Sequence, residues 1–324
     1  MSAPAQPRHW GVRVLKALGI AASVLCLLSS VLLAYHLLTH GRTPPIRDAR
    51  GAVVPGSVAS LEHIALGGVP QWVLIRGRSP KNPVVLFLHG GPGMPAMCLA
   101  HAWQRPLEND FVMVQWDRLG VGKSYFGEIP SRYLTVRRLL DDTYELANFL
   151  RGRFSQDRLI LVGHSWGSYL GMLAVHERPD LFRAYVGVGQ LTGSARGDTL
   201  LARAQETSWW PLLRLGLRAP EYTLGDVLRI PKGLSLYARA LQFDVPADTL
   251  RTDVTAVQVP VYFVAGRGDE TAPSEPAERY LAALRAPKKG FVWFEASAHF
   301  PFLEEPERFL EVMRRVAAET AAGR

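Results

Sequence analysis

The stretch Arg158–Gly167, which reads RLILVGHSWG, decides the fold of this chain. Its first part, Arg158–Gly163, is an apolar run typical of a strand buried on both faces of a sheet, and helical patterning follows it to His176. Between the two, Gly163-His164-Ser165-Trp166-Gly167 has small residues that permit a sharp turn from strand to helix. Such a turn lifts a serine hydroxyl into a cleft at a helix N-terminus, whose partial positive charge favours developing anions. Ser165 is therefore a candidate nucleophile.

Strand-like and helical stretches alternate along most of the remaining chain. Gly67-Gly68 predicts a hairpin, Thr135 could cap a helix with one apolar face, and Pro306 is expected to open a terminal helix to about Ala321. The expected strands are Ser57–Leu66, Gln71–Arg76, Val84–His89, Phe111–Trp116, Arg158–Gly163, Ala184–Gly189, Val261–Ala265 and Gly290–Phe294. This order predicts an α/β fold with a mostly parallel sheet and helices on both faces.

One segment, between Gln190 and Val259, breaks the alternation, because it has helical patterning and no strand. An insertion of about seventy residues into a regular sheet is most simply a lid over an active site. We therefore predict one domain over residues 57–324, with a helical lid at about 191–257.

A serine nucleophile needs a base, and the base needs an orienting carboxylate. Asp269 follows the expected strand Val261–Ala265, and His299 follows Gly290–Phe294. The carboxyl ends of parallel strands meet at the edge where ligands bind, and the chain order serine, acid, histidine suits this kind of turn. We therefore predict a triad of Ser165, Asp269 and His299, with Glu270 as a rival acid.

His89-Gly90-Gly91-Pro92-Gly93 ends the strand Val84–His89 and is the most specific string in the chain. Glycines let a backbone N–H approach a reacting carbonyl without a Cβ in the way. In folds with this serine turn, the loop at this position supplies one donor of the oxyanion hole. The predicted donors are the backbone N–H groups of Gly91 and Trp166.

Together these motifs resemble the proline iminopeptidase family of α/β hydrolases. The resemblance runs along most of 59–318 and is carried by HGGPG (89–93), WDRLGVGKS (116–124), GHSWGS (163–168), VGQ (188–190), Gly266–Asp269 and His299. It implies an α/β-hydrolase fold and release of an N-terminal residue, typically proline, from a peptide without metal or cofactor. It also implies that Ser165 is the nucleophile, that Asp269 orients and that His299 is the base. Members usually read Asp-Gln-Arg-Gly after the fourth strand, whereas Asp117-Arg118-Leu119-Gly120 places arginine one position earlier here.

The same resemblance implies that acidic lid residues bind the ammonium group of the substrate. Glu206 is the first candidate, with Glu221 and Asp226 behind it, although each is more simply a solvated carboxylate. The aromatic residues of the lid could line a pocket for a proline ring or form the core of the lid; they are Trp209, Trp210 and Tyr222.

The N-terminal residues predict a membrane anchor. Ala17–Leu38 holds no charged residue, and its 22 residues would form a helix of roughly 33 Å, enough for a hydrocarbon core of about 30 Å. A cleaved signal has a shorter apolar stretch, of about 7–15 residues, and a small-residue cleavage site that this segment lacks. We expect a short segment 1–16, a signal-anchor helix 17–38 and a stalk 39–56. Arg13 and Lys16 favour a cytosolic N-terminus and an exported, periplasmic or extracellular, domain.

Composition excludes several other classes. With 48% hydrophobic and 20% charged residues among 324, the chain can bury a large core and is not disordered. Two cysteines make no disulfide scaffold, and the net charge of +8 is scattered, with no nucleic-acid-binding signature. Three functions remain open: an anchored aminopeptidase acting on short peptides, a carboxylesterase or lipase-like hydrolase of small acyl esters, and a non-catalytic binding protein of this fold.

Overall fold

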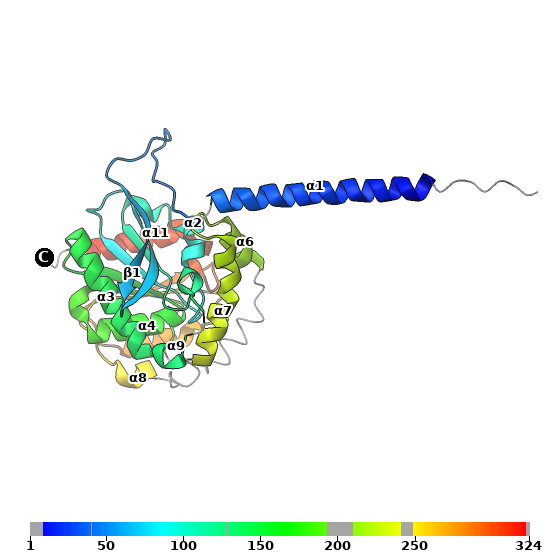
Figure 1. Ribbon diagram of the computed structural model, residues 1–324. Coiled ribbons are helices and arrows are strands. Elements are labelled where there is room, and N and C mark those ends of the chain that lie inside the picture. The colour runs from blue at the N-terminus through cyan, green and yellow to red at the C-terminus, as the bar shows by residue number, and fades with distance from the viewer. Residues whose placement is uncertain (1–8, 40, 128, 193–209, 241–248, 322–324) are drawn as a thin grey trace, which may run out of the picture.

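The computed structural model describes residues 9–39, 41–127, 129–192, 210–240 and 249–321 (Figure 1). Eight strands form one sheet in the order β1-β2-β4-β3-β5-β6-β7-β8. They are β1 (Val58–Leu66), β2 (Val69–Gly77), β3 (Val84–Leu88), β4 (Val112–Trp116), β5 (Leu159–His164), β6 (Phe182–Val188), β7 (Val261–Gly266) and β8 (Lys289–Phe294). β2 pairs antiparallel with β1 and β4, and all other pairs are parallel, which confirms the predicted sheet.

Helices cover both faces of the sheet, as predicted. The helices are α1 (His9–Thr39), α2 (Ala100–Trp103), α3 (Val136–Phe154), α4 (Trp166–Glu177), α6 (Trp210–Arg218), α7 (Leu224–Ala240), α8 (Thr249–Asp253), α9 (Ser274–Ala283), α10 (Pro301–Glu304) and α11 (Pro306–Thr320). One core packs the sheet against α3, α4 and α9, and the other packs it against α2, α10 and α11. Within β3, Val84, Leu86 and Leu88 belong to the first core, and the residues between them to the second. A strand buried on both faces therefore reads as a continuous apolar run.

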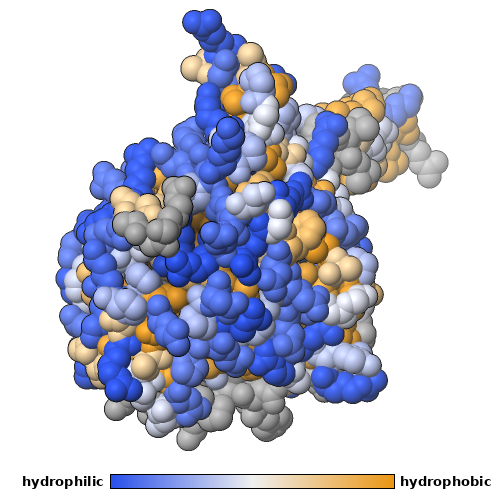
Figure 2. Space-filling model, turned by 90° about the vertical axis from the view of Figure 1, so that its left-hand side faces the viewer, coloured by the Kyte–Doolittle hydropathy of each residue, from blue (hydrophilic) through white to orange (hydrophobic). Residues whose placement is uncertain are grey.

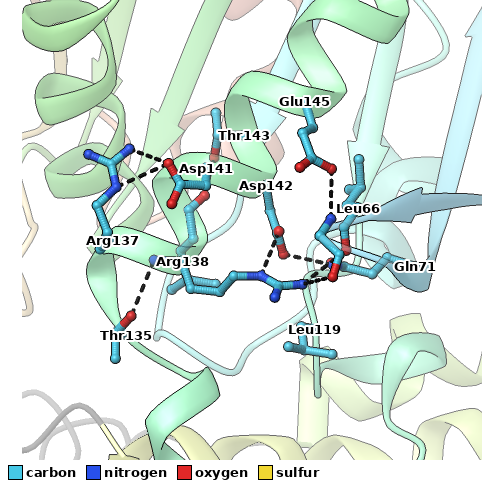
Figure 3. A network of polar contacts seen from close by, with 12 residues as sticks. Leu66, Gln71, Leu119, Thr135, Arg137, Arg138, Asp141, Asp142, Thr143 and Glu145 are labelled. Carbon is cyan, nitrogen blue, oxygen red and sulfur yellow. Dashed lines mark hydrogen bonds and ion pairs between the residues drawn. The ribbon is translucent and has the colours of Figure 1, made fainter.

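Polar contacts hold the β1–β2 hairpin against α3 (Figure 3). Arg138 donates to the carbonyl oxygens of Leu66 and Gly67, both at 3.0 Å, and to the carboxylate of Asp142 at 2.7 Å. Gln71 donates to the other oxygen of Asp142 at 2.8 Å, so this buried carboxylate has two partners. The helix begins where expected, since the hydroxyl oxygen of Thr135 accepts from the N–H of Arg138 at 3.2 Å.

Between β6 and β7, the described residues hold α6, α7 and α8 and no strand, in agreement with the expected helical insertion. Residues 193–209 and 241–248 of this segment lie outside the described part of the chain. α7 continues through Pro231, and its Gly233 packs closely on the loop after β3, because a Cβ at Gly93 would lie 2.4 Å from the carbonyl oxygen of Gly233.

The N-terminal helix α1 projects away from the domain (Figure 1). It begins at His9, earlier than the expected Ala17, and the stretch that is long and apolar enough to cross a membrane is Gly11–Tyr35, with no buried residue. Arg13 and Lys16 lie inside this stretch. Long basic side chains of this kind can reach the membrane–water interface from within a helix. A signal sequence near the N-terminus can also meet these criteria of length and composition.

The residues after α1 dock on the domain. The N–H of Arg42 donates to the carbonyl of Pro220 at 3.1 Å, and Thr43 donates to the carboxylate of Glu221 at 2.9 Å. Arg76 of β2 donates to the carbonyl of Pro44 at 2.6 Å. These contacts tie the stalk to the turn between α6 and α7.

Candidate functional site

Ser165 lies at the sharp turn between β5 and α4 with φ 52° and ψ −123°. It is one of only two non-glycine residues with positive φ in the described chain, and such strain persists only where the surroundings impose it. Glycine is required on both sides of the turn. A Cβ at Gly163 would lie 2.5 Å from the carbonyl oxygen of Gly167, and one at Gly167 would lie 2.2 Å from that of Leu88. The backbone therefore presents Ser165 at the edge of the sheet.

Asp269 follows β7 and His299 follows β8, and the two side chains meet. The Nδ1 atom of His299 lies 2.9 Å from Oδ2 of Asp269. The other oxygen, Oδ1, accepts the backbone N–H groups of Thr271 at 2.9 Å and Ala272 at 2.8 Å. Burial alone would raise the pKa of Asp269, but the hydrogen bond and charge of His299 and the Ala272 N–H outweigh it, so the pKa lies below its usual value. An ionised Asp269 only accepts hydrogen bonds, so Nδ1 of His299 carries the proton and Nε2 is left as an acceptor.

His164, the residue before the serine, holds the histidine loop. Its Nε2 lies 2.8 Å from the backbone carbonyl oxygen of His299, and the two rings are 4.8 Å apart. Burial, together with the nearby charge of His299, lowers the pKa of His164 to about 3, so His164 stays neutral and donates to that carbonyl. The sequence holds only one signal for this contact, a histidine at the variable position of the turn.

Ser165 and His299 line one pocket of about 330 Å³. Gly91 and Trp166, whose N–H groups are the predicted oxyanion donors, line the same pocket. Gly91 has φ 33°, and Trp166 is the first residue of α4, where backbone N–H groups lack partners within the helix. Apolar side chains not identified from the sequence make up much of the wall; they are Met94, Leu99, Leu234, Phe300 and Phe302. Glu270, the rival acid, also lines the pocket, but Asp269 is the carboxylate bonded to His299.

Arg118 holds the loop that contains Gly91. Its Nη2 atom donates to the backbone carbonyl oxygens of His89 at 2.9 Å and Pro92 at 3.1 Å, and lies 3.0 Å from Nδ1 of His89. The side chain is fully buried, and burial lowers its pKa to about 10, which still leaves it charged near neutral pH. The arginine that stands one position early therefore binds the glycine-rich loop through carbonyl oxygens.

The lid candidates have different fates. Glu206 and Trp209 lie outside the described residues, and Trp210 begins α6 with its side chain also outside them. Glu221 is buried against Thr43 and is not among the residues that line the pocket. The other two are bonded to the loop after β4: Tyr222 donates to Asp117, and Asp226 pairs with Lys123 at 2.8 Å. Within the described residues, no group of histidine, cysteine and carboxylate side chains could hold a metal ion.

Comparison with known proteins defines the class. Residues 85–312 match the model of the alpha/beta hydrolase family, and the chain belongs to this family. It is 29% identical to a probable aminopeptidase, YbaC, of Bacillus subtilis (strain 168), over 81% of this chain and 97% of the relative. It is 26% identical to a proline iminopeptidase of Heyndrickxia coagulans, over 71% of this chain and 88% of the relative.

Among solved structures, a bacterial membrane phospholipase A superimposes with a TM-score of 0.62 at 18% identity, over 98% of this chain and 100% of that one. At this identity the likeness concerns the fold alone. The chain is thus an alpha/beta hydrolase, and a hydrolase enzyme, whose relatives are aminopeptidase-like.

Proposed function

We propose that this protein is a membrane-anchored serine hydrolase with Ser165 as nucleophile, His299 as base and Asp269 as orienting acid. The observation that carries the proposal is the strained turn at Ser165, which lines the same pocket as a His299 already bonded to Asp269 at 2.9 Å. A serine, a histidine with a free Nε2 and an ionised carboxylate are the parts that acyl transfer requires.

In the proposed mechanism, the hydroxyl oxygen of Ser165 attacks a carbonyl carbon while Nε2 of His299 takes the hydroxyl proton. Asp269 holds the Nδ1–H tautomer and stabilises the imidazolium that forms. The N–H groups of Gly91 and Trp166 donate to the oxyanion, a contribution worth about 10²–10³ in rate for one such donor. His299 then protonates the leaving group, and a water molecule, deprotonated by the same histidine, releases the acyl group from Ser165.

The proposed substrate is the N-terminal residue of a short peptide. The names of the two relatives, a probable aminopeptidase and a proline iminopeptidase, support this choice. The largely apolar wall, with Leu99, Leu234 and Phe302, suits a compact apolar residue such as proline.

A second candidate is hydrolysis of small acyl esters by the same residues. The apolar wall favours an acyl chain equally well. The two candidates differ in charge recognition, because an aminopeptidase requires the free ammonium of its substrate and an esterase does not.

The test uses S165A and, as a matched control, S235A, which removes an exposed serine hydroxyl of α7. S165A should lose at least about 10⁴-fold in kcat against both proline arylamide and short acyl esters, with an unchanged melting temperature, while S235A keeps full activity. Retained activity in S165A would refute the assignment. Acetylation of the N-terminus of the arylamide should abolish turnover if the protein is a peptidase. If the wild-type protein fails to react with a fluorophosphonate, the result favours the hypothesis of a non-catalytic binding protein.

A further inference from the structure

The exposed surface of α6 and α7 carries leucines and positive charge together. On α6, Arg214, Leu217 and Arg218 are exposed at a spacing that places them on one face. On α7, Leu224, Leu228 and Lys232 are exposed at intervals of four residues, and Leu228 is 64% exposed. We call these six residues the lid face.

Among residues 210–240, every exposed charged residue is basic. Both acidic residues of this range, Glu221 and Asp226, are buried, and Asp226 pairs with Lys123 at 2.8 Å and with Arg229 at 3.4 Å. All five basic residues of the same range are exposed; they are Arg214, Arg218, Arg229, Lys232 and Arg239. Exposed leucines among basic residues, without acidic ones, are typical of helices that lie at the surface of an anionic membrane.

The helices α6 and α7, which carry the lid face, lie on the side of the domain from which α1 projects (Figure 1). The stalk is bonded to the turn between α6 and α7, through the 3.1 Å hydrogen bond of Arg42 to Pro220. By contrast, the opposite side of the domain, which carries α3, is mostly hydrophilic (Figure 2). A helix that spans a bilayer would thus hold the lid face near the same bilayer.

We propose that the lid face docks on the surface of a bilayer that contains anionic lipid, with its leucines at the level of the headgroups. The proposal rests on the proposed anchor, since α1 supplies the proximity. It has a consequence for the pocket, because α7 also contributes Leu234 to the pocket wall and packs through Gly233 on the loop of Gly91. Contact with the bilayer would therefore act on α7, the helix that contributes Leu234 to the pocket wall.

The test places an environment-sensitive fluorophore on the lid face of the full-length chain. The variant L228C is made in a C26S background, because Cys26 is exposed and Cys98 is buried. The matched control is N148C, on the exposed face of α3 on the opposite side. Each labelled protein is reconstituted into phosphatidylcholine vesicles, with or without phosphatidylglycerol, that carry a quencher in the headgroup region.

In anionic vesicles, the probe at L228C should shift to the blue and be quenched at least threefold more than the probe at N148C. Removing two charges with R218Q and K232Q should lower the ratio of docked to undocked lid about thirtyfold. The control pair K81Q and R315Q removes the same charge elsewhere and should leave it unchanged. None of these variants should alter hydrolysis of a water-soluble ester.

Each other outcome counts against the proposal in its own way. A chain that floats with the vesicles but shows equal quenching at both probes refutes the docking and keeps the anchor. A chain that does not float with vesicles refutes both. Equal quenching in neutral vesicles refutes the role of charge. Disulfide formation between unlabelled L228C chains on mild oxidation with copper phenanthroline, together with no quenching of the labelled protein, assigns the face to a second copy of the chain.

Discussion

At the scale of single residues, Arg118 links the fold to the proposed chemistry. Two of its three guanidinium nitrogens, Nε and Nη1, have no hydrogen-bond partner among the described protein atoms, and the third binds two carbonyl oxygens of one loop. Burying a charge costs free energy unless the charge is paired or hydrogen-bonded. The hydrogen bonds of Arg118 go to the loop after β3, so we infer that the role of this buried charge is to hold that loop. These bonds fix the backbone on both sides of Gly91, which lines the pocket.

We therefore expect R118M to lower kcat by about 10–100-fold with little change in KM, because an oxyanion donor acts mainly in the transition state. R118K should recover part of the loss, since one ammonium can reach a carbonyl oxygen. The comparison is steady-state kinetics on an ester substrate, with R105M as the control because Arg105 is exposed. A fall in kcat matched by an equal fall in the folded fraction of R118M, measured by circular dichroism, would show that Arg118 only supports the fold.

The residues that follow the strands could be predicted from the sequence, because their positions follow from the order of the strands. Ser165, Asp269 and His299 each follow a recognisable apolar run, and parallel strands bring their carboxyl ends to one edge. The contact of His164 with His299 and that of Arg118 with His89 could not be predicted. Both join loops whose conformation is set by packing and not by a local sequence pattern. The pocket wall was missed for the same reason.

At the scale of elements, a buried polar network joins the lid to the loop after β4. Asp117 accepts the hydroxyl of Tyr222 and, at 2.9 Å, the N–H of Lys123, and Lys123 pairs with Asp226 of α7. From the sequence, Tyr222 and Asp226 are candidates for substrate binding. An acidic or aromatic lid residue gives no local sign of which residue it contacts, so these partners could not be predicted. Their described contacts are those of an anchor between two elements.

This network predicts a pH dependence of stability. Burial raises the pKa of Asp117 to about 7, against 3.8 in an ordinary setting, although Tyr222 and Lys123 oppose the shift. Between pH 4 and pH 7 the folded form keeps a proton that the unfolded chain has lost, so this group's contribution to the free energy of unfolding falls as pH rises. The contribution is fully present below about pH 4 and lost above about pH 7.

D117N should therefore lack this component. The difference in free energy of unfolding between wild type and D117N should fall by a few kcal/mol between pH 4 and pH 8, as measured by urea denaturation. D141N, which changes an exposed aspartate of α3, should follow the wild-type curve. A pH-independent difference between wild type and D117N would contradict the assignment of a raised pKa to Asp117.

At the scale of the whole molecule, the stalk connects the N-terminal helix to the domain through specific contacts. Arg76 forms a buried ion pair with Glu108 at 2.8 Å and also donates to Thr43 and Pro44, and Thr43 donates in turn to Glu221. The prolines and glycines of this segment predict a stalk. Its composition does not indicate which buried charged residues the segment contacts.

We expect a chain that begins at residue 41 to be more stable than one that begins at 57. The shorter chain loses the hydrogen bonds to Arg76, Pro220 and Glu221 and the burial of Ile46, with charged partners contributing about 1.5–3 kcal/mol each and neutral ones about 1. Summed over these contacts, the expected cost is on the order of 5 kcal/mol, which should lower the melting temperature by about 10 °C. T43A in the longer chain should show part of this cost, and R50A, at an exposed position of the same stalk, should show none. Equal melting temperatures for the two truncated chains would mean that the stalk adds no stability, and that the lid turn holds its place without it.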